Sequence, residues 1–218
     1  MSYQVDTKNA YRNNVKANAY LGQYTHGFKW ARFTMWKQKK IVDNYLNICN
    51  LGNSDIVLDI PCGAGYIGGI LSKYNCSVIA SDISMQMMKL GVDEYSDVHF
   101  KGFIQSDITS TPFESKQFKC IVVLSLMHRL PTEIRMQVLS ELSRIGSKYL
   151  IISYSVESIL QRLKIGFLSM LSSKYKPAPA SIPMKVILDE LNSFGFVVKK
   201  RKRIVNLLSS KVVFLVAN

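Results

Sequence analysis

Short runs of aliphatic and β-branched residues recur along the chain, and the segments between them carry apolar residues at helical spacing. Such runs are typical of strands buried on both faces of a parallel sheet, with helices as the crossovers. The expected strands are 56–58, 77–80, 103–105, 120–124 and 148–154, followed by an antiparallel pair, 196–205 and 211–216. This pattern predicts an α/β fold with a seven-stranded, mostly parallel, doubly wound sheet that ends in an antiparallel pair.

The helical spacing predicts helices at about 7–20, 27–50, 132–144, 156–171 and 184–194. Thr132 and Ser155 are expected to be N-caps, and Gly195 is expected to end the last helix. We interpret residues 1–50 as a helical lid and residues 51–218 as one domain.

The segment VLDIPCGAGYIGG, residues 57–69, joins the first strand to an apolar helix through a glycine-rich turn. Gly63 and Gly65 allow the backbone to approach a ligand closely, which indicates a nucleotide site at the carboxyl edge of the sheet. The turn also satisfies GxGxxG, with Asp82 as the following acid, so a dinucleotide such as NAD is an alternative. Asp59 argues against NAD, because its carboxylate would repel a pyrophosphate. It suits S-adenosylmethionine, which has no phosphate and carries a sulfonium and an ammonium group.

The order of two hydrophobic residues, Asp59, Ile60, Pro61, Cys62 and Gly63 resembles the first motif of class I S-adenosylmethionine-dependent methyltransferases. The region TPFESKQFKCIVVLSLMHRLP, residues 111–131, also resembles this family. The resemblance implies that Asp82 binds both ribose hydroxyls and that Asp107 accepts the adenine amino proton.

The remaining site residues are expectations from the same resemblance. The cofactor is expected to contact residues of the glycine turn and of the three following strand ends: Asp59, Pro61, Cys62, Gly63, Ala64, Gly65, Asp82, Ile83, Met87, Asp107, Ile108, Leu124 and Ser125. His128 is the expected catalytic residue, because a neutral imidazole could take or relay a proton from a hydroxyl or amine acceptor. The acceptor is expected to contact Tyr11, Tyr20, Trp30, Arg32 and Arg129. Residues 1–25 are expected to order when the cofactor binds.

The net charge of +13 is unevenly distributed along the chain. Residues 1–54 carry +6 and residues 157–218 carry +8, whereas residues 55–156 carry −1. Basic flanks attract anionic partners, although they also serve solubility alone. The segments DIPCGAG, LMHRLP and DELNSFGF resemble small bacterial methyltransferases that act on metabolites or on lipid and glycan head groups. That resemblance implies a small-molecule or envelope-precursor acceptor, methylated at O or N, and the basic flanks suggest that this acceptor is anionic. An RNA acceptor and a catalytically silent binding protein with this fold stay open as alternatives.

The four cysteines, Cys49, Cys62, Cys76 and Cys120, show no CxxC or other paired spacing. Neither a metal site nor a disulfide is expected, which fits a reducing cytoplasm. The N-terminus is polar and no apolar run approaches the length of a membrane span, so neither a signal segment nor a transmembrane segment is expected.

Overall fold

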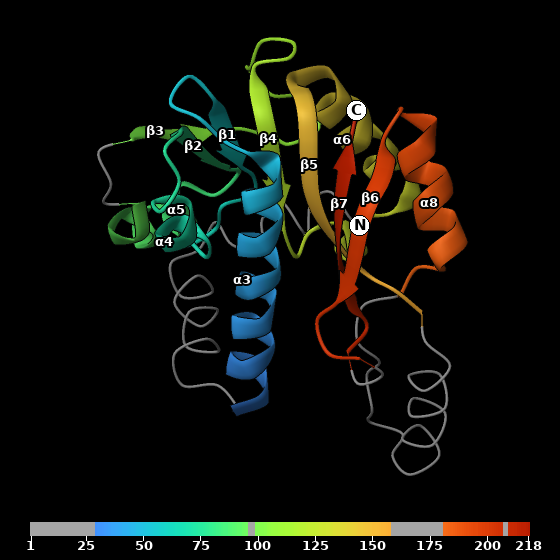
Figure 1. Cartoon of the computed structure of the whole chain (residues 1–218). Helices are drawn as coiled ribbons and strands as arrows, with labels where there is room; N and C mark the ends of the chain where they lie inside the picture. Colours follow the sequence, from blue (N-terminus) through green and yellow to red (C-terminus); the bar gives the residue numbers. More distant parts are fainter. Residues whose placement is uncertain (1–28, 96–98, 158–180, 207–208) are drawn as a thin grey trace.

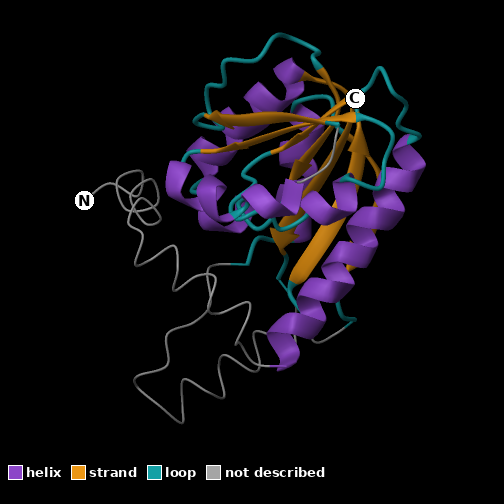
Figure 2. Cartoon of the chain, turned by 90° about the vertical axis from the view of Figure 1, so that its left-hand side faces the viewer, coloured by secondary structure: helices purple, strands orange, loops and turns teal. Residues whose placement is uncertain are grey.

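The computed structural model describes residues 29–95, 99–157, 181–206 and 209–218, which form a seven-stranded sheet with helices on both faces (Figures 1 and 2). The strand order is β3-β2-β1-β4-β5-β7-β6. All neighbouring pairs are parallel except those of β7, which runs antiparallel to β5 and β6. The predicted fold class is therefore confirmed, including the antiparallel pair at the end of the chain.

The strands lie close to the expected segments: β1 (Ile56–Asp59), β2 (Ser77–Asp82), β3 (Phe100–Gln105), β4 (Phe118–Val123), β5 (Gly146–Ser155), β6 (Val197–Arg203) and β7 (Lys211–Ala217). The helices are α3 (Lys29–Cys49), α4 (Gly68–Leu71), α5 (Met85–Leu90), α6 (Thr132–Ile145) and α8 (Met184–Ser193). Two short 3-10 turns, η1 (Val92–Tyr95) and η2 (Met127–Arg129), follow α5 and β4.

Alternate residues of the central strands enter two separate cores, one on each face of the sheet. Val57 of β1 packs with α3, α4 and α5, whereas Leu58 packs with α6 and α8. The same alternation continues on β4, where Val122 and Val123 lie in opposite cores. Burial on both faces explains why these strands are continuous apolar runs in the sequence.

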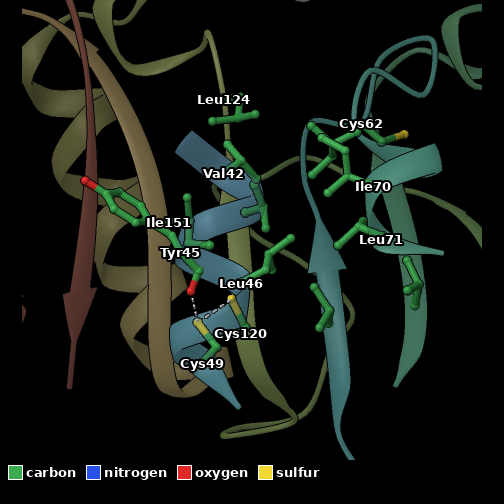
Figure 3. Close-up of a cluster of buried hydrophobic side chains, with 14 of the residues drawn as sticks. Val42, Tyr45, Leu46, Cys49, Cys62, Ile70, Leu71, Cys120, Leu124 and Ile151 are labelled. Atoms are coloured by element: carbon green, nitrogen blue, oxygen red, sulfur yellow. Dashed lines mark hydrogen bonds between the residues drawn. The ribbon is translucent and has the colours of Figure 1, made fainter. Parts of the chain in front are cut away.

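Helix α3 packs across the sheet through one apolar face (Figure 3). Val42, Tyr45 and Leu46 are buried against the core that includes Ile151 of β5. The Cys49 thiol donates to the Tyr45 carbonyl oxygen at 3.2 Å. The N-terminal half of α3 extends past the carboxyl edge of the sheet, where β1, β2 and β4 end (Figure 1).

The helix predicted from Thr132 does begin at that residue, but the two predicted N-caps are wrong, for different reasons. Thr132 is the first helical residue, Pro131 occupies the N-cap position, and the Thr132 hydroxyl accepts a hydrogen bond from Arg135 at 3.1 Å. Ser155 is the last residue of β5, and Val156 forms a bridge with Ile182, so no helix begins at 156. Backbone pairing with a distant segment outweighs the local capping signal here. The expected helix at 7–20 and most of the one at 156–171 lie outside the described residues.

Two ion pairs connect elements that are distant in sequence. Arg135 of α6 and Glu190 of α8 are both buried and lie 2.5 Å apart, from Nη2 to Oε1. Lys119 at the start of β4 contacts Asp55, just before β1, at 2.6 Å from Nζ to Oδ2.

Candidate active site at the carboxyl edge of the sheet

The acids predicted from the sequence come together at one edge of the sheet. Asp59 and Asp82 are the last residues of β1 and β2, and Asp107 follows the end of β3 by two positions. These three strands are neighbours in the order β3-β2-β1. The chain order reverses between β1 and β4, and such switch points are where open α/β sheets bind ligands.

Asp82 holds the glycine turn against the end of β2. Its Oδ2 accepts a hydrogen bond from the Gly63 amide at 2.8 Å, and its Oδ1 accepts one from the Ser84 amide at 2.8 Å. The Cys62 amide also donates to the Ser81 carbonyl at 2.8 Å. Burial raises the pKa of Asp82, and the backbone hydrogen bonds only partly offset this effect. Each carboxylate oxygen can accept a further bond, so Asp82 retains the hydrogen-bonding capacity that the predicted contact with ribose requires.

Backbone angle favours glycine at both positions of the turn, and packing also requires it at Gly65. Gly63 and Gly65 have φ of 54° and 76°, which favour glycine. A Cβ on Gly65 would lie 2.6 Å from the Glu94 Cβ, and one on Gly91 would lie 2.6 Å from the Gly65 nitrogen. The turn therefore packs directly on Gly91 and Glu94, a contact that motif spacing does not reveal.

Asp59 has a partner that the sequence analysis missed. Its carboxylate is 2% exposed and accepts a hydrogen bond from the Tyr95 hydroxyl of η1. Burial raises the pKa of Asp59 to about 7; the Tyr95 hydrogen bond lowers it in part, and the charge of Asp82 raises it. Tyr95 is 36 residues away in sequence and belongs to no motif, so no sequence signal identifies this pair.

The residues expected around adenine differ in their burial and in their hydrogen-bond partners. Met87 is buried, and its Cε would lie 3.7 Å from a Cβ on Gly63, so its side chain borders the glycine turn. Ile83 and Ile108 are partly buried. Asp107 Oδ1 accepts hydrogen bonds from the Thr109 amide at 3.0 Å and hydroxyl at 2.8 Å, so Asp107 also stabilises a turn.

The end of β4 brings a second group of predicted residues to this edge. Leu124 is buried in the same core as Cys62 (Figure 3). Ser125 adopts φ of 59°, unusual for a residue other than glycine, and its amide donates to the Ser153 hydroxyl at 2.8 Å. Strained backbone of this kind is often found at ligand sites.

His128 and Arg129 follow in η2, beside the start of β7. Burial, together with the positive charges of Lys211 and Arg129, lowers the pKa of His128 to about 4. The imidazole is therefore neutral throughout the physiological pH range, unlike an ordinary histidine, which titrates near pH 6.5. Burial is the main cause of this change, and Lys211, which no sequence motif singled out, adds to it.

The residues predicted to contact the acceptor are only partly brought together. Trp30 and Arg32 lie on the exposed N-terminal half of α3, and the Trp30 ring packs on Phe33 with centroids 5.8 Å apart. Among the described residues, no hydrogen bond, ion pair or ring contact joins Trp30 or Arg32 to the glycine turn. The turn instead reaches α3 through Tyr66, whose hydroxyl donates to the Met35 carbonyl at 2.8 Å. Tyr11 and Tyr20 lie outside the described residues.

The described part of the chain contains neither a metal-site cluster nor a membrane-spanning helix. No three His, Cys, Asp or Glu side chains gather there as a metal site would require. None of its helices combines the length and the apolar character needed to cross a membrane.

Residues 57–147 match a family model described as a methyltransferase domain. The chain is also similar to malonyl-[acyl-carrier protein] O-methyltransferase of Marinomonas sp. strain MWYL1, at 31% identity over 91 residues. That match covers 40% of this chain and 33% of the relative, so the chain spans about a third of the length of this curated relative.

Solved structures match over most or all of the chain. Magnesium protoporphyrin IX methyltransferase from Synechocystis PCC 6803, solved with bound S-adenosylhomocysteine, superposes with a TM-score of 0.80 at 14% identity and covers 99% of both chains. A S-adenosylmethionine-dependent methyltransferase from Methanosarcina mazei superposes with a TM-score of 0.63 at 18% identity, covering 82% of this chain and 96% of that one. Residues 57–147 therefore match a methyltransferase domain, and the chain has the fold of known S-adenosylmethionine-dependent methyltransferases.

Proposed function

We propose that this protein transfers a methyl group from S-adenosylmethionine to an oxygen or nitrogen of an anionic small molecule, or of a lipid or glycan head group. The observation that carries the proposal is a division of charge along the carboxyl edge. Asp59 and Asp82 lie at the ends of β1 and β2, whereas His128, Arg129 and Lys211 lie around β4 and β7. A cationic cofactor fits the first side, and an anionic acceptor fits the second.

The glycine-turn side fits a cofactor with a positive charge and no phosphate. The charge of Asp82 contributes to the raised pKa of Asp59, so the two carboxylates interact across the turn. Burial raises the pKa of the Cys62 thiol, and the charges of both carboxylates raise it further. A pyrophosphate would meet the same negative potential and be repelled, whereas an ammonium or sulfonium group would be attracted.

The protein's own task in such a reaction is to bind and orient the reactants. The cofactor would supply an activated methyl group on a sulfonium that is also a good leaving group. His128 is neutral, so it can accept or relay the proton that a hydroxyl or amine acceptor loses. Alignment of the reactants within a closed site accounts for much of the rate in reactions of this kind.

The named relatives support an acceptor other than nucleic acid. One is named for malonyl-[acyl-carrier protein] and another for magnesium protoporphyrin IX, and neither acceptor is RNA. These names describe those proteins, and the acceptor of this chain belongs to the proposal.

A specific feature favours RNA as the second candidate acceptor. Between α3 and the end of β6 lies a cavity of about 420 Å³, lined by Phe33, Lys37, Lys40, Ile41, Asn44, Lys202, Arg203, Ile204, Val205 and Asn206. Its lining holds four cations and no acid. Phe33 is exposed and belongs to a stripe of aromatic rings with Trp30 and Trp36 on α3. A basic groove beside exposed rings is typical of surfaces that bind single-stranded nucleic acid.

Calorimetry with S-adenosylhomocysteine tests the proposed function. Asp82→Ala removes charge-assisted hydrogen bonds worth about 1.5–3 kcal/mol each, so affinity should fall at least tenfold. Asp93→Ala, at an exposed acid of η1, is the matched control and should bind as the wild type does. NAD should not bind. Tight NAD binding, or equal affinity in the wild type and Asp82→Ala, would refute the cofactor assignment.

The acceptor class is tested by incubating the protein with radiolabelled S-adenosylmethionine and with RNA, lipid or small-metabolite fractions of a cell extract. Label in the small-metabolite or lipid fraction supports the first candidate. Label in RNA, lost when Lys37 and Lys202 are both changed to Glu, supports the second. Cofactor binding with no labelled product in any fraction supports the catalytically silent alternative.

A further inference from the structure

The face of the sheet beneath α3 changes from apolar to polar at the carboxyl edge. Ile151 of β5 pairs with Leu215 of β7, and both lie in the α3-side core. Four residues further along β5 on the same face, Ser155 pairs with Lys211. The Ser155 hydroxyl donates to the Ser210 hydroxyl at 2.9 Å, so the polar groups beside Lys211 are held in place.

No carboxylate among the described residues pairs with the ammonium group of Lys211. Its side chain forms no salt bridge in that part of the chain, although the residue is partly buried. Burial lowers the pKa of Lys211, and the nearby charge of Arg129 lowers it further. A partly buried ammonium beside a guanidinium is costly unless an anion offsets the repulsion.

His128 completes the basic cluster from the side of β4. Its buried Nδ1 has no hydrogen-bond partner among the described residues. η2 follows β4, and β5 lies between β4 and β7. The charges of Lys211 and Arg129 both act on the His128 imidazole, so the three side chains lie near one another at this edge. The cluster therefore combines an ammonium, a guanidinium and an unpaired imidazole nitrogen, which are three groups suited to bind a carboxylate or phosphate.

The cluster lies close to the expected reaction centre but apart from the cofactor side. Neighbouring strands are about 4.8 Å apart, so β7 is about 14 Å from β1 and about 10 Å from β4. If Lys211 bound the anionic group of a small acceptor, the rest of that acceptor could extend toward Ser125 at the end of β4. A short, singly anchored molecule fits this spacing better than a long polymer.

We propose that Lys211, Arg129 and His128 form a subsite that binds a carboxylate or phosphate group of the methyl acceptor. The subsite rests on the proposed function, and it names the residues that would select an anionic acceptor. Lys211 is a binding residue here, and His128 both faces the anion and remains available to the acceptor's proton.

The subsite is tested with two probes, inorganic phosphate and malonate, added to the protein saturated with S-adenosylhomocysteine. The readout is the ring NMR signal of His128, which is distinguished from those of His26 and His99 by its absence in His128→Gln. At least one probe should shift this signal in a saturable way. Malonate alone acting indicates a carboxylate subsite, and phosphate alone acting indicates a phosphate subsite.

Lys211→Met keeps most of the aliphatic stem and removes the charge, so it should weaken anion binding at least tenfold. Arg129→Gln is a second variant with the same expected direction. Lys200→Met, at an exposed lysine on β6, is the matched control and should bind the anion as the wild type does. No saturable shift in the wild type, or equal binding in wild type and Lys211→Met, overturns the subsite. Calorimetry of S-adenosylhomocysteine on the same samples distinguishes failure of the subsite from failure of the proposed function. If the cofactor binds but the anion does not, only the subsite is overturned. If the cofactor does not bind either, the proposed function fails as well.

Discussion

The buried carboxylate of Asp59 makes the stability of this protein depend on pH in an unusual direction. Asp59 is 2% exposed, and no cation among the described residues pairs with it. Burial raises its pKa from 3.8 to about 7, in spite of the hydrogen bond from Tyr95. Asp59→Asn replaces the carboxylate with an amide that cannot ionise but can still accept the Tyr95 hydrogen bond.

The expected effect follows from the difference between the folded and unfolded pKa. An acid whose pKa is raised by folding stabilises the folded state while it is protonated. That contribution is complete below the unfolded pKa of 3.8 and is lost as the pH rises through about 7. Each pKa unit corresponds to about 1.4 kcal/mol, so the whole loss is about 4 kcal/mol. Of this, about 2 to 3 kcal/mol falls between pH 5 and pH 8.

Urea denaturation of the wild type and Asp59→Asn at pH 5, 6, 7 and 8 measures this effect. The difference in unfolding free energy should shift in favour of the variant by about 2 to 3 kcal/mol from pH 5 to pH 8. A constant difference across this range would refute the buried, raised-pKa carboxylate.

Asp55→Asn is the control, because the pKa of Asp55 is shifted the other way. Burial tends to raise this pKa, but the hydrogen bond from Lys119 and the remaining interactions outweigh burial and lower it. Its contribution is present above pH 3.8 and is lost only as the pH falls through the lowered pKa. The cost of Asp55→Asn should therefore be the same at pH 5 and pH 8.

Two further predictions test the basic side of the site and the helices behind the sheet. The ring of His128 should not titrate between pH 5.5 and 8, since its pKa is about 4, and His128→Ala should lower turnover by about 10² to 10⁴ at every pH in that range. An NMR titration midpoint near 6.5 for His128 would contradict this. Glu190→Ala leaves the Arg135 guanidinium buried without its partner, so unfolding free energy should fall by about 3–5 kcal/mol in urea denaturation. Glu133→Ala, at an exposed acid of α6, should change it by less than about 0.5 kcal/mol, and equal losses in the two variants would argue against the buried pair.

The local pattern of the chain was sufficient to predict the strands and their class. A strand buried on both faces must be apolar at successive positions, and the run at Val57 and Leu58 shows this without reference to any distant residue. The acids at the strand ends were predictable for a similar reason. Parallel strands bring their carboxyl ends to one edge, so Asp59 and Asp82 had to lie near each other once the fold class was known.

Helix starts were less predictable, because capping signals compete with pairing that the sequence does not display. Ser155 has the residue type of an N-cap, yet it extends β5 opposite Lys211. The hydrogen bonds of that ladder come from a segment more than fifty residues later. A short segment of the sequence cannot contain both Ser155 and Lys211, so this pairing cannot be predicted from local sequence.

The sequence by itself therefore determined the α/β architecture, the glycine turn and the acids around it, since each depends on the spacing of neighbouring residues. Only the tertiary structure decided which groups face one another at the edge: Tyr95 on Asp59, Glu94 against the glycine turn, and Lys211 beside His128. Burial, together with the Tyr95 and Lys211 contacts, sets the pKa values of Asp59 and His128. These contacts join residues that are far apart along the chain, and the free energy of burying charge depends on the three-dimensional surroundings of a group and not on its neighbours in sequence.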